Sequence, residues 1–171
     1  VVQEKINPES KVRMKATLDA FFEAYFDDVP ETERYTNRIT LFKADDGRTL
    51  LEPYCRSGTQ YQKGIQSLKI NSDGEEENEG IAGQAWFRNA TVSPDPLPEC
   101  PSQWSDTDPA CQEYARRSFL TNSKAANLHV KSRSLVATPV RDFKGNQWGI
   151  LVLDSRRPDG IDPRKEALVK A

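Results

Sequence analysis

Apolar residues near the beginning of the chain recur at helical spacing. They follow one another at intervals of three or four residues, so they would share one face of an α-helix. The stripe consists of Met14, Leu18, Phe21, Phe22, Tyr25 and Phe26. Asn7 and Pro8 suit the start of such a helix, and Pro30 cannot continue one. The pattern predicts an amphipathic helix over residues 8–28.

Alternating apolar and polar positions then predict a β-hairpin. Its strands would be residues 39–43 and 49–56, joined by the sequence Asp-Asp-Gly at positions 45–47. The glycine of this turn would accept the positive φ that a tight hairpin needs. Pro53 removes a backbone N–H from the second strand, which indicates an edge or a bulge there. A short third strand is expected within residues 66–70.

The middle of the chain is less regular. Residues 80–88 predict a short helix, and residues 91–92 a short strand. Residues 93–109 contain five prolines and therefore predict an irregular excursion, after which helical periodicity returns over residues 110–122. Residues 71–79 hold five acidic side chains but lack the ligand spacing of a calcium loop, which favours an exposed, flexible loop.

The last third of the chain has the strongest β pattern. Residues 134–141 and 147–154 are predicted strands on either side of a turn at residues 143–146. Both are apolar on both faces, which is typical of strands in the middle of a covered sheet. A last helix is expected from residue 163, cut short by the end of the sequence. We predict one α+β domain over residues 1–171, with a central antiparallel sheet and helices on both sides.

Composition narrows the class of function. The chain has 171 residues, with 24 Lys and Arg against 26 Asp and Glu, which gives a net charge of −2. This balance removes the broad electrostatic case for nucleic acid as a partner. No apolar run approaches the ~20 residues of a membrane span, and we expect a cytoplasmic domain. Because the sequence has no initiating Met, we also expect a piece of a longer protein, whose tethering to a membrane is left open.

Histidine and cysteine are scarce. His129 is the single histidine, which excludes every mechanism that needs two. Cys55, Cys100 and Cys111 form an odd set, which argues against a disulfide-framed secreted module and favours a reducing compartment. With His129 they make the count of a zinc site, but the chain has no Cys-x-x-Cys pair, and we expect neither a metal nor a cofactor. A disulfide between Cys100 and Cys111 stays open.

Four segments carry a family resemblance. They read RITLF at residues 38–42, EGIAGQAW at 79–86, SLVATPV at 134–140 and GNQWGILVLD at 145–154. In this order the chain, from about residue 13 onward, resembles GAF domains, which are small sensory domains of signalling proteins with a PAS-related fold. The resemblance implies a central antiparallel sheet of five or six strands, with a small-molecule pocket on one side of it and a dimer-prone helical layer on the other.

The resemblance also implies where a ligand would bind. The variable stretch of GAF-like domains corresponds here to about residues 88–133. Aromatic walls with a few convergent polar groups are typical of a small-ligand site. The candidate ligand-binding residues are Trp86, Trp104, Cys111, Tyr114, Arg117, His129, Thr138 and Trp148. The candidate contacts of a homodimer, on the first helix, are Met14, Leu18, Phe22 and Phe26.

Three ligand-specific or catalytic subtypes of the family fit the sequence poorly. Relatives that attach a bilin use a cysteine commonly followed by histidine, whereas neither Cys100 nor Cys111 is followed by one. Relatives that bind cyclic nucleotides carry an Asn-Lys pair, and here Asn146 precedes Gln147. Relatives that reduce methionine sulfoxide need several cysteines clustered over the pocket, and the three cysteines show no such arrangement.

We therefore expect a noncatalytic sensory or regulatory domain. It would bind a small molecule between the sheet and the variable loop, and signal through its terminal helices to a flanking signalling or membrane module. The signal would be a change in the ordering of residues 93–122. An alternative is a structural homodimerisation module without a ligand. A third is a redox enzyme that uses cysteine, although no acid, base or nucleophile is assembled in the sequence.

Overall fold

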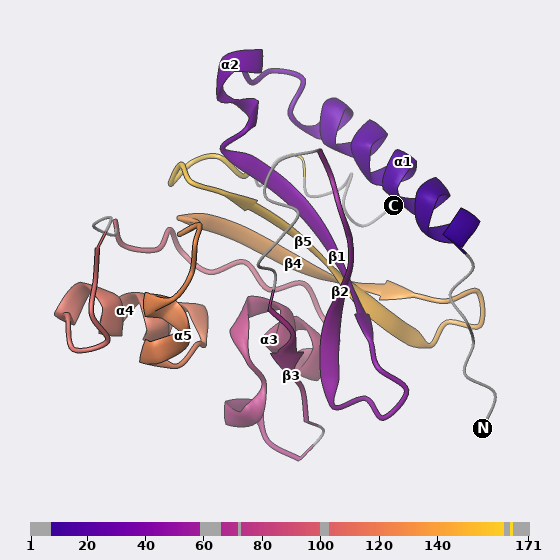
Figure 1. The fold of residues 1–171 in the computed structure, drawn as a ribbon. Coiled ribbons are helices and arrows are strands. Elements are labelled where there is room, and N and C mark those ends of the chain that lie inside the picture. Colours follow the sequence, from indigo (N-terminus) through magenta and orange to yellow (C-terminus); the bar gives the residue numbers. More distant parts are fainter. Residues whose placement is uncertain (1–7, 59–65, 72, 100–102, 163–164, 166–171) are drawn as a thin grey trace.

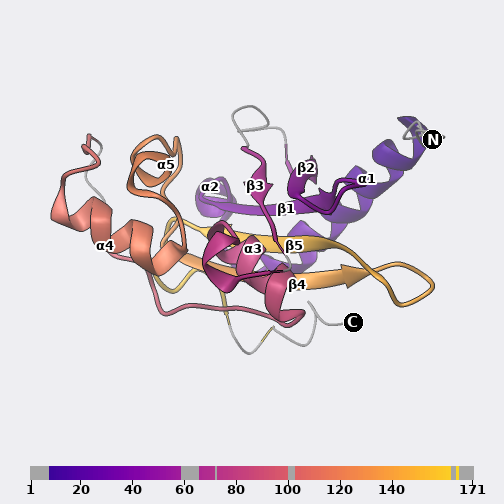
Figure 2. The same cartoon turned by 90° about the horizontal axis from the view of Figure 1, so that it is seen from below.

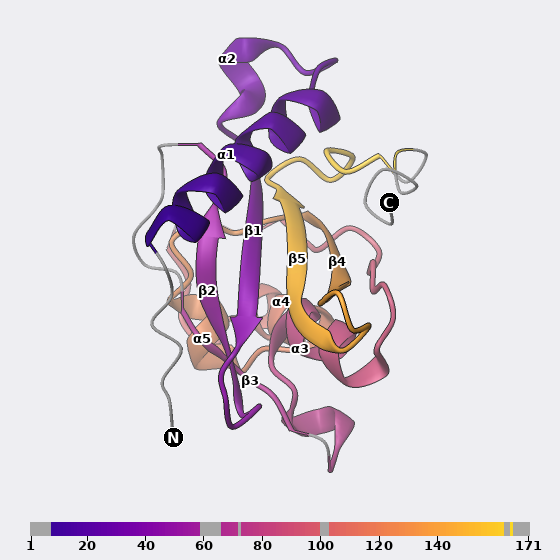
Figure 3. The ribbon, with the colours of Figure 1, turned by 90° about the vertical axis from the view of Figure 1, so that its right-hand side faces the viewer.

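The computed structural model describes residues 8–58, 66–71, 73–99, 103–162 and 165. A five-stranded antiparallel sheet runs through the centre, with the strand order β3-β2-β1-β5-β4. Figures 1 and 3 show one long helix, α1, across one face of the sheet and helices α3, α4 and α5 on the other. The predicted α+β fold, with helices on both sides of an antiparallel sheet, is confirmed.

The strands lie within one or two residues of most predicted bounds. They are β1 Asn37–Ala44, β2 Leu50–Arg56, β3 Leu68–Lys69, β4 Ser134–Arg141 and β5 Gln147–Ser155. β1 and β5 lie in the middle of the sheet, but β4 is an edge strand, so its predicted central position is wrong. β4 is apolar on both faces because Val136 packs in the core on the α1 side and Ala137 in the core on the α3 side. A bridge from Val92 to Ala137 covers part of its edge. That bridge replaces the short strand predicted at residues 91–92.

The turn between β1 and β2 is built differently from the prediction. The residue with a positive φ is Arg48, at 52°, and not Gly47. The Asp45 carboxylate accepts hydrogen bonds from the backbone N–H groups of Thr49 at 2.7 Å and Leu50 at 2.8 Å. These bonds lower the pKa of Asp45 below its usual value, although burial alone would raise it. The aspartate therefore holds the turn, while glycine at position 47 does not supply its left-handed conformation.

Pro53 lies at a β-bulge, as its position in the strand predicts. The register shifts where Leu41 pairs with Cys55 but Phe42 pairs with Pro53, so Tyr54 is the extra residue. A bulge tolerates the missing N–H of proline because the ladder is already interrupted there.

Helix α1 spans Pro8–Tyr25 and packs its apolar stripe on the sheet. Leu18 and Phe26 are 5% and 1% exposed and contact the side chains of the sheet on this face. These two residues are therefore covered by their own chain, which corrects their assignment as contacts with a second copy. Met14 and Phe22 are only half-buried. The predicted cap at Asn7 lies outside the described residues.

The end of α1 falls short of the predicted residue 28. Lys165 donates a hydrogen bond from Nζ to the Tyr25 carbonyl oxygen at 2.7 Å, at the last residue of the helix. After a turn, the short helix α2 follows at Glu31–Arg34. The C-terminal helix expected from residue 163 lies outside the described residues, apart from Lys165 itself.

Helix α3, at Gly80–Arg88, has the predicted bounds and covers the opposite face of the sheet (Figure 2). Its Ile81 and Ala85 join a core with Phe42 and Ile150 from the central strands. A Cβ atom at Gly83 would lie 2.8 Å from the backbone carbon of Asn78, so the preceding loop packs too closely for any larger residue. The small residues of this segment thus bring α3 against its neighbours.

The helix predicted over residues 110–122 is two helices, α4 at Pro109–Ser118 and α5 at Asn122–Ala126. Asp108 caps α4 by accepting a hydrogen bond from the Ala110 N–H at 2.8 Å. Phe119 ends α4 in the left-handed region, with a φ of 57°. Leu97, from the proline-rich excursion, is fully buried against these helices. The excursion is thereby packed on α4 and α5 where the structure describes it.

The acidic segment at residues 71–79 is exposed, as predicted, but its backbone is held by one buried side chain. Asn78 accepts a hydrogen bond from the Asn71 N–H at 2.9 Å and donates to the carbonyl oxygens of Asn71 at 2.9 Å and Gly74 at 2.7 Å. A short 3₁₀ turn, η1 at Glu75–Glu77, presents the acids to solvent. Within the ranges that the structure describes, no helix has the length and apolar character needed to cross a membrane.

Candidate functional site

A cavity of about 170 Å³ lies between the sheet and helices α3, α4 and α5. Its walls are aliphatic and come from elements on several sides. They include Ile81, Leu120, Leu128, Leu135 and Val152. Its floor is polar, because Arg38, Thr40 and Arg56 project from β1 and β2 on this face, with Asp154 from β5. This combination of apolar walls and a few converging polar groups is the usual form of a small-molecule site.

An ion pair between neighbouring strands forms the first part of the floor. Arg38 and Asp154 are directly paired across β1 and β5. Arg38 donates to Asp154 Oδ1 from Nε at 2.8 Å, and Ser132 donates its hydroxyl to the same oxygen at 2.5 Å. The two charged side chains are 14% and 6% exposed. Because burying a charge is costly without a partner, the three groups depend on one another.

Arg56 adds a second buried guanidinium. Its Nε donates to Thr40 Oγ1 at 2.8 Å across the pair that these two residues form between β2 and β1. Burial, together with the charge of Arg38, lowers the pKa of Arg56 to about 10, and the charge of Asp154 opposes this shift. The cavity floor therefore holds two arginines and one carboxylate.

The rim of the cavity carries a further ion pair and two of the predicted residues. Lys124, at the cavity, pairs with Glu79. Burial would raise the pKa of Glu79, but hydrogen bonds from Lys124 and from the Lys69 N–H lower it below its usual value. Tyr114 and His129 also line the cavity, and the Tyr114 hydroxyl donates to the Ser132 carbonyl oxygen at 2.9 Å.

No protein-family model and no curated protein sequence matches this chain. Solved structures do match. One is the GAF domain of a phosphoenolpyruvate-protein phosphotransferase from Acinetobacter, with a TM-score of 0.55 at 14% identity, over 94% of this chain and 82% of that one. The chain has a GAF-like fold.

Two further structures with this GAF-like fold belong to proteins of different kinds. A type II free methionine-R-sulfoxide reductase from Thermoplasma acidophilum matches with a TM-score of 0.50 at 15% identity, over 92% of this chain and 85% of that one. The NreA protein of Staphylococcus aureus, solved with a mutated nitrate binding site, matches with a TM-score of 0.53 at 14% identity, over 90% of each chain. Because one fold carries a reductase in one protein and a nitrate binding site in another, function must be argued from the site.

Two other predicted residues lie behind the cavity wall of this GAF-like domain. The Trp104 ring packs edge-on against Tyr114, with ring centroids 5.4 Å apart. Lys131 Nζ lies 4.9 Å from the centroid of the same tryptophan. Cys111 is fully buried and joins the Tyr114 cluster. Trp104 and Cys111 therefore support Tyr114 and do not themselves line the cavity.

The other four predicted ligand-binding residues lie elsewhere. Trp86 belongs to the core beneath α3, and Arg117 is half-buried on α4. Thr138 lies on the α1 face of β4 and hydrogen-bonds to Thr91. Trp148 sits where the pairing of β4 and β5 shifts register, and its ring packs on the α1 side. The alternation along β4 places Thr138 on the α1 face of the sheet, and the bulge in β5 places Trp148 on the same face. Both side chains therefore point away from the cavity.

The sequence prediction missed the floor residues Arg38, Arg56, Ser132 and Asp154. The available signal was a charged residue next to an apolar strand. Arg38 directly precedes the predicted strand over residues 39–43, and Asp154 is the last residue of the predicted strand over residues 147–154. A charge at such a position needs a partner, and the partner of each is the other.

The cysteines do not form a site among the described residues. Cys55 lies on the α1 face of the sheet, whereas Cys111 lies in the α4–α5 cluster on the opposite face. Burial raises the pKa of the Cys55 thiol to about 11 and raises that of Cys111 as well, which disfavours a reactive thiolate. Cys100, whose disulfide with Cys111 the sequence leaves open, lies outside the described residues. Within the described ranges no cluster of His, Cys, Asp and Glu could hold a metal ion.

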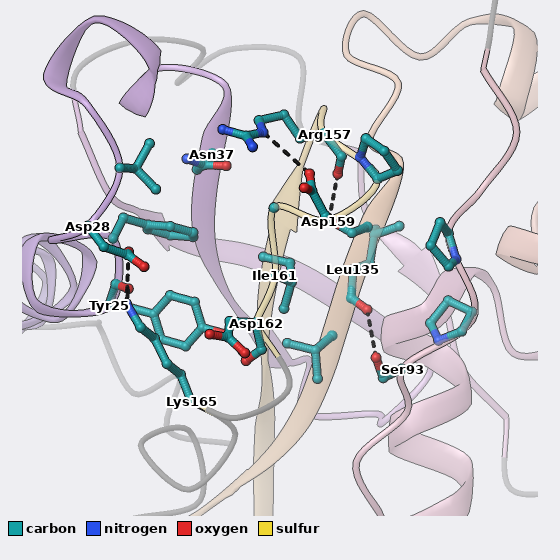
Figure 4. Close-up of a pocket in the computed structure, with 18 of the residues that line it drawn as sticks. Tyr25, Asp28, Asn37, Ser93, Leu135, Arg157, Asp159, Ile161, Asp162 and Lys165 are labelled. Carbon is teal, nitrogen blue, oxygen red and sulfur yellow. Dashed lines mark hydrogen bonds and ion pairs between the residues drawn. The ribbon is translucent and has the colours of Figure 1, made fainter.

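A larger hollow of about 790 Å³ lies between the end of α1, residues 93–96 and residues 157–162 (Figure 4). Much of its charge is neutralised internally, since Lys165 pairs with Asp28 at 2.9 Å and Arg157 with Asp159 at 3.4 Å. Asn37 is 4% exposed, and neither polar atom of its side chain has a hydrogen-bond partner. This hollow lies between the C-terminal end of α1 and the segment that follows β5, whereas the smaller cavity concentrates buried positive charge.

Proposed function

We propose that this chain is a noncatalytic sensory or regulatory domain that binds a small molecule in the cavity between the sheet and helices α3 to α5. The observation that carries the proposal is the buried polar floor. Two arginines are expensive to bury, and an apolar contact between sheet and helices would be simpler to form. Hydrogen-bonded charges under aliphatic walls make sense as a preorganised binding surface. The GAF domain among the structural neighbours supports a sensory role.

The route of the signal is part of this proposal. Asp154 lies at the end of β5, directly before the segment that crosses to α1. In that segment the Asp162 carbonyl oxygen accepts a hydrogen bond from the Tyr25 hydroxyl at 3.1 Å. A ligand that changes the position of Asp154, or the ordering of residues 93–122, would therefore bias the contact between the end of α1 and the segment that follows β5. Flanking modules in a longer protein would receive that change.

The enzyme alternative has weaker support. The reductase neighbour shows that a GAF-like fold can carry chemistry, but at 15% identity it contributes only the fold. Cys55 and Cys111 are not among the residues that line the cavity, and the pKa values of both thiols are raised. We therefore propose binding without turnover.

Ligand screening tests the proposal. The purified domain would be examined by native mass spectrometry for bound small molecules and by thermal shift against a broad metabolite panel. A ligand present at 100 times its dissociation constant should stabilise the fold by about 2.7 kcal/mol. The blocking variant is Leu128→Trp, because Leu128 is half-buried at the cavity and a larger ring would fill it.

Val12→Trp is the matched control, since Val12 is 70% exposed on α1 and distant from the cavity face. The proposal predicts that Leu128→Trp loses the stabilisation and that Val12→Trp keeps it. If no compound of the panel stabilises the wild-type domain, the ligand-binding function is rejected in favour of a structural module.

A further inference from the structure

The charge of the cavity is unbalanced. Among the described residues that line it, Arg38, Arg56 and Lys124 carry positive charge, and Asp154 is the one carboxylate. Glu79, just outside the lining, neutralises Lys124. The formal charges of these five described side chains sum to one positive charge, and Arg38 and Arg56 lie at the buried end of the cavity. A ligand with one negative charge would balance it.

The volume of the cavity limits the size of that ligand. At about 170 Å³ it is smaller than the roughly 300–1,000 Å³ of pockets for drug-sized ligands. Such a space favours a compact molecule and disfavours a nucleotide. The aliphatic wall formed by Ile81, Leu128 and Val152 faces the same space, so part of the ligand should be apolar. Charge, size and wall chemistry together describe a short-chain carboxylate.

We propose that the cavity binds a small monocarboxylate, whose carboxylate lies against the guanidinium groups of Arg56 and Arg38 and whose short apolar chain lies against the aliphatic wall. This inference rests on the proposed function and names the ligand class for the same cavity. A guanidinium presents a planar set of donors that matches the two oxygens of a carboxylate. Burial of Arg56, at 8% exposure, strengthens that recognition because little water competes.

The buried arginine also explains why the site would respond to its ligand. The neighbouring charge of Arg38 and the loss of water both act against the charged form of Arg56, as its lowered pKa indicates. An anion removes this unfavourable interaction when it binds. An anion next to Arg56 would therefore favour its charged form, and such an interaction, made only in the liganded state, supplies the differential affinity that a sensor requires.

Paired ligands that differ in charge test the inference. Butyrate and butyramide have similar shapes, but only butyrate is an anion. Isothermal titration and thermal shift of the wild-type domain should detect butyrate binding and at least tenfold weaker binding of butyramide. Equal binding of the two compounds would overturn the inference, and so would binding of nitrate without binding of butyrate, since nitrate offers the charge but no apolar chain.

Variants of the arginine add a second test. Arg56→Met removes the charge at the cavity floor, and Arg116→Met removes one from the surface of α4, where the Arg116 side chain is 71% exposed. Butyrate affinity should fall at least tenfold in Arg56→Met and stay unchanged in Arg116→Met. Arg56→Lys keeps the positive charge but lacks the planar guanidinium, so its butyrate affinity should lie between that of Arg56→Met and that of the wild type. Full affinity in a folded Arg56→Met variant would contradict the inference.

The outcomes separate this inference from the proposed function. If a neutral or cationic metabolite stabilises the domain, and Leu128→Trp abolishes its binding, the cavity is a ligand site but the anion assignment is wrong. If neither carboxylates nor any other compound binds, the proposed function itself fails. Because the comparison of butyrate with butyramide uses only the wild-type domain, it decides the charge class even if an arginine variant does not fold.

Discussion

At the scale of single residues, two buried asparagines have opposite hydrogen-bonding states. The Asn78 side chain makes three hydrogen bonds to neighbouring backbone, whereas that of Asn37 makes none. An unsatisfied buried polar group costs about 1–3 kcal/mol, and a satisfied one contributes to the fold. The same substitution should therefore act in opposite directions at these two positions.

We predict that Asn37→Leu stabilises the domain by about 1–2 kcal/mol and that Asn78→Leu destabilises it by about 2–3 kcal/mol. Urea denaturation of both variants measures the free energy of unfolding. Leucine has nearly the shape of asparagine, so the difference reports the amide. A loss of stability in Asn37→Leu would show that its amide is hydrogen-bonded to water in solution.

The Arg38–Asp154 pair gives a second prediction at this scale. Asp154→Asn leaves the Arg38 guanidinium buried without its counter-charge, so the domain should lose about 3–5 kcal/mol of stability. The double variant Arg38→Met with Asp154→Leu removes both charges and should recover most of that loss. Equilibrium denaturation of the single and double variants measures the coupling. If the single and the double variant lose the same free energy of unfolding, the unpaired charge of Arg38 is not the cause of the loss.

At the scale of secondary-structure elements, the main role of the apolar stripe of α1 is to pack on the sheet of its own chain. Leu18 and Phe26 are covered by the sheet of the same chain, which leaves Met14 and Phe22 as the part of the stripe that a second copy could contact. Homodimerisation through α1 stays a prediction, narrowed to these two residues. A charge at Phe26 would destroy the fold and would say nothing about association.

We predict that Met14→Glu converts a dimer into a folded monomer. Its half-buried side chain would carry a charge into the contact between copies, where it has no partner. Light scattering gives the mass, and circular dichroism confirms the fold. Ala16→Glu is the control, because Ala16 is exposed on the opposite side of α1. An unchanged mass for Met14→Glu, or a wild-type domain that is already monomeric, would remove α1 as the interface.

Helices and strands were predictable from the sequence where the local pattern of residues determines them. They were less predictable where contacts with distant parts of the chain determine them. The strands and α3 follow from apolar runs and alternation, which survive any tertiary arrangement. The division between α4 and α5 depends on Phe119 in a left-handed conformation, a position at which sequence alone would favour glycine or asparagine. The face of Trp148 depends on a register shift, and the partner of Arg38 lies 116 residues away. Site residues therefore needed the tertiary structure.

At the scale of the whole molecule, the described end of the chain is fastened to the end of α1. Lys165 bonds to the Tyr25 carbonyl oxygen and pairs with Asp28, and the Tyr25 hydroxyl donates to the Asp162 carbonyl oxygen. Figure 4 shows these side chains together on one side of the larger hollow. If ligand binding in the cavity is signalled through the terminal segments, these contacts must couple the two segments. They must also be weak enough to rearrange when the ligand binds.

The titration of Tyr25 reports how strongly the contacts between α1 and the C-terminal segment stabilise the fold. Burial, together with the charge of Asp162, raises the pKa of Tyr25 from 10.0 to about 12, and the charge of Lys165 opposes this rise. The neutral phenol is thus favoured in the folded state. Its contribution to stability is fully present below pH 10 and is lost as the pH rises through about 12.

We predict that the free energy of unfolding falls more steeply between pH 10 and pH 12 in the wild-type domain than in Tyr25→Phe, by about 1–2 kcal/mol in total. The difference between the two proteins removes the titration of every other group. Tyr35→Phe is the control, since Tyr35 is 52% exposed, and it should follow the wild type. A ligand in the cavity should change the size of this Tyr25-dependent step if cavity and terminal segments are coupled. The same step with and without ligand would show that the fastening is static, and the signal would then have to leave through another element.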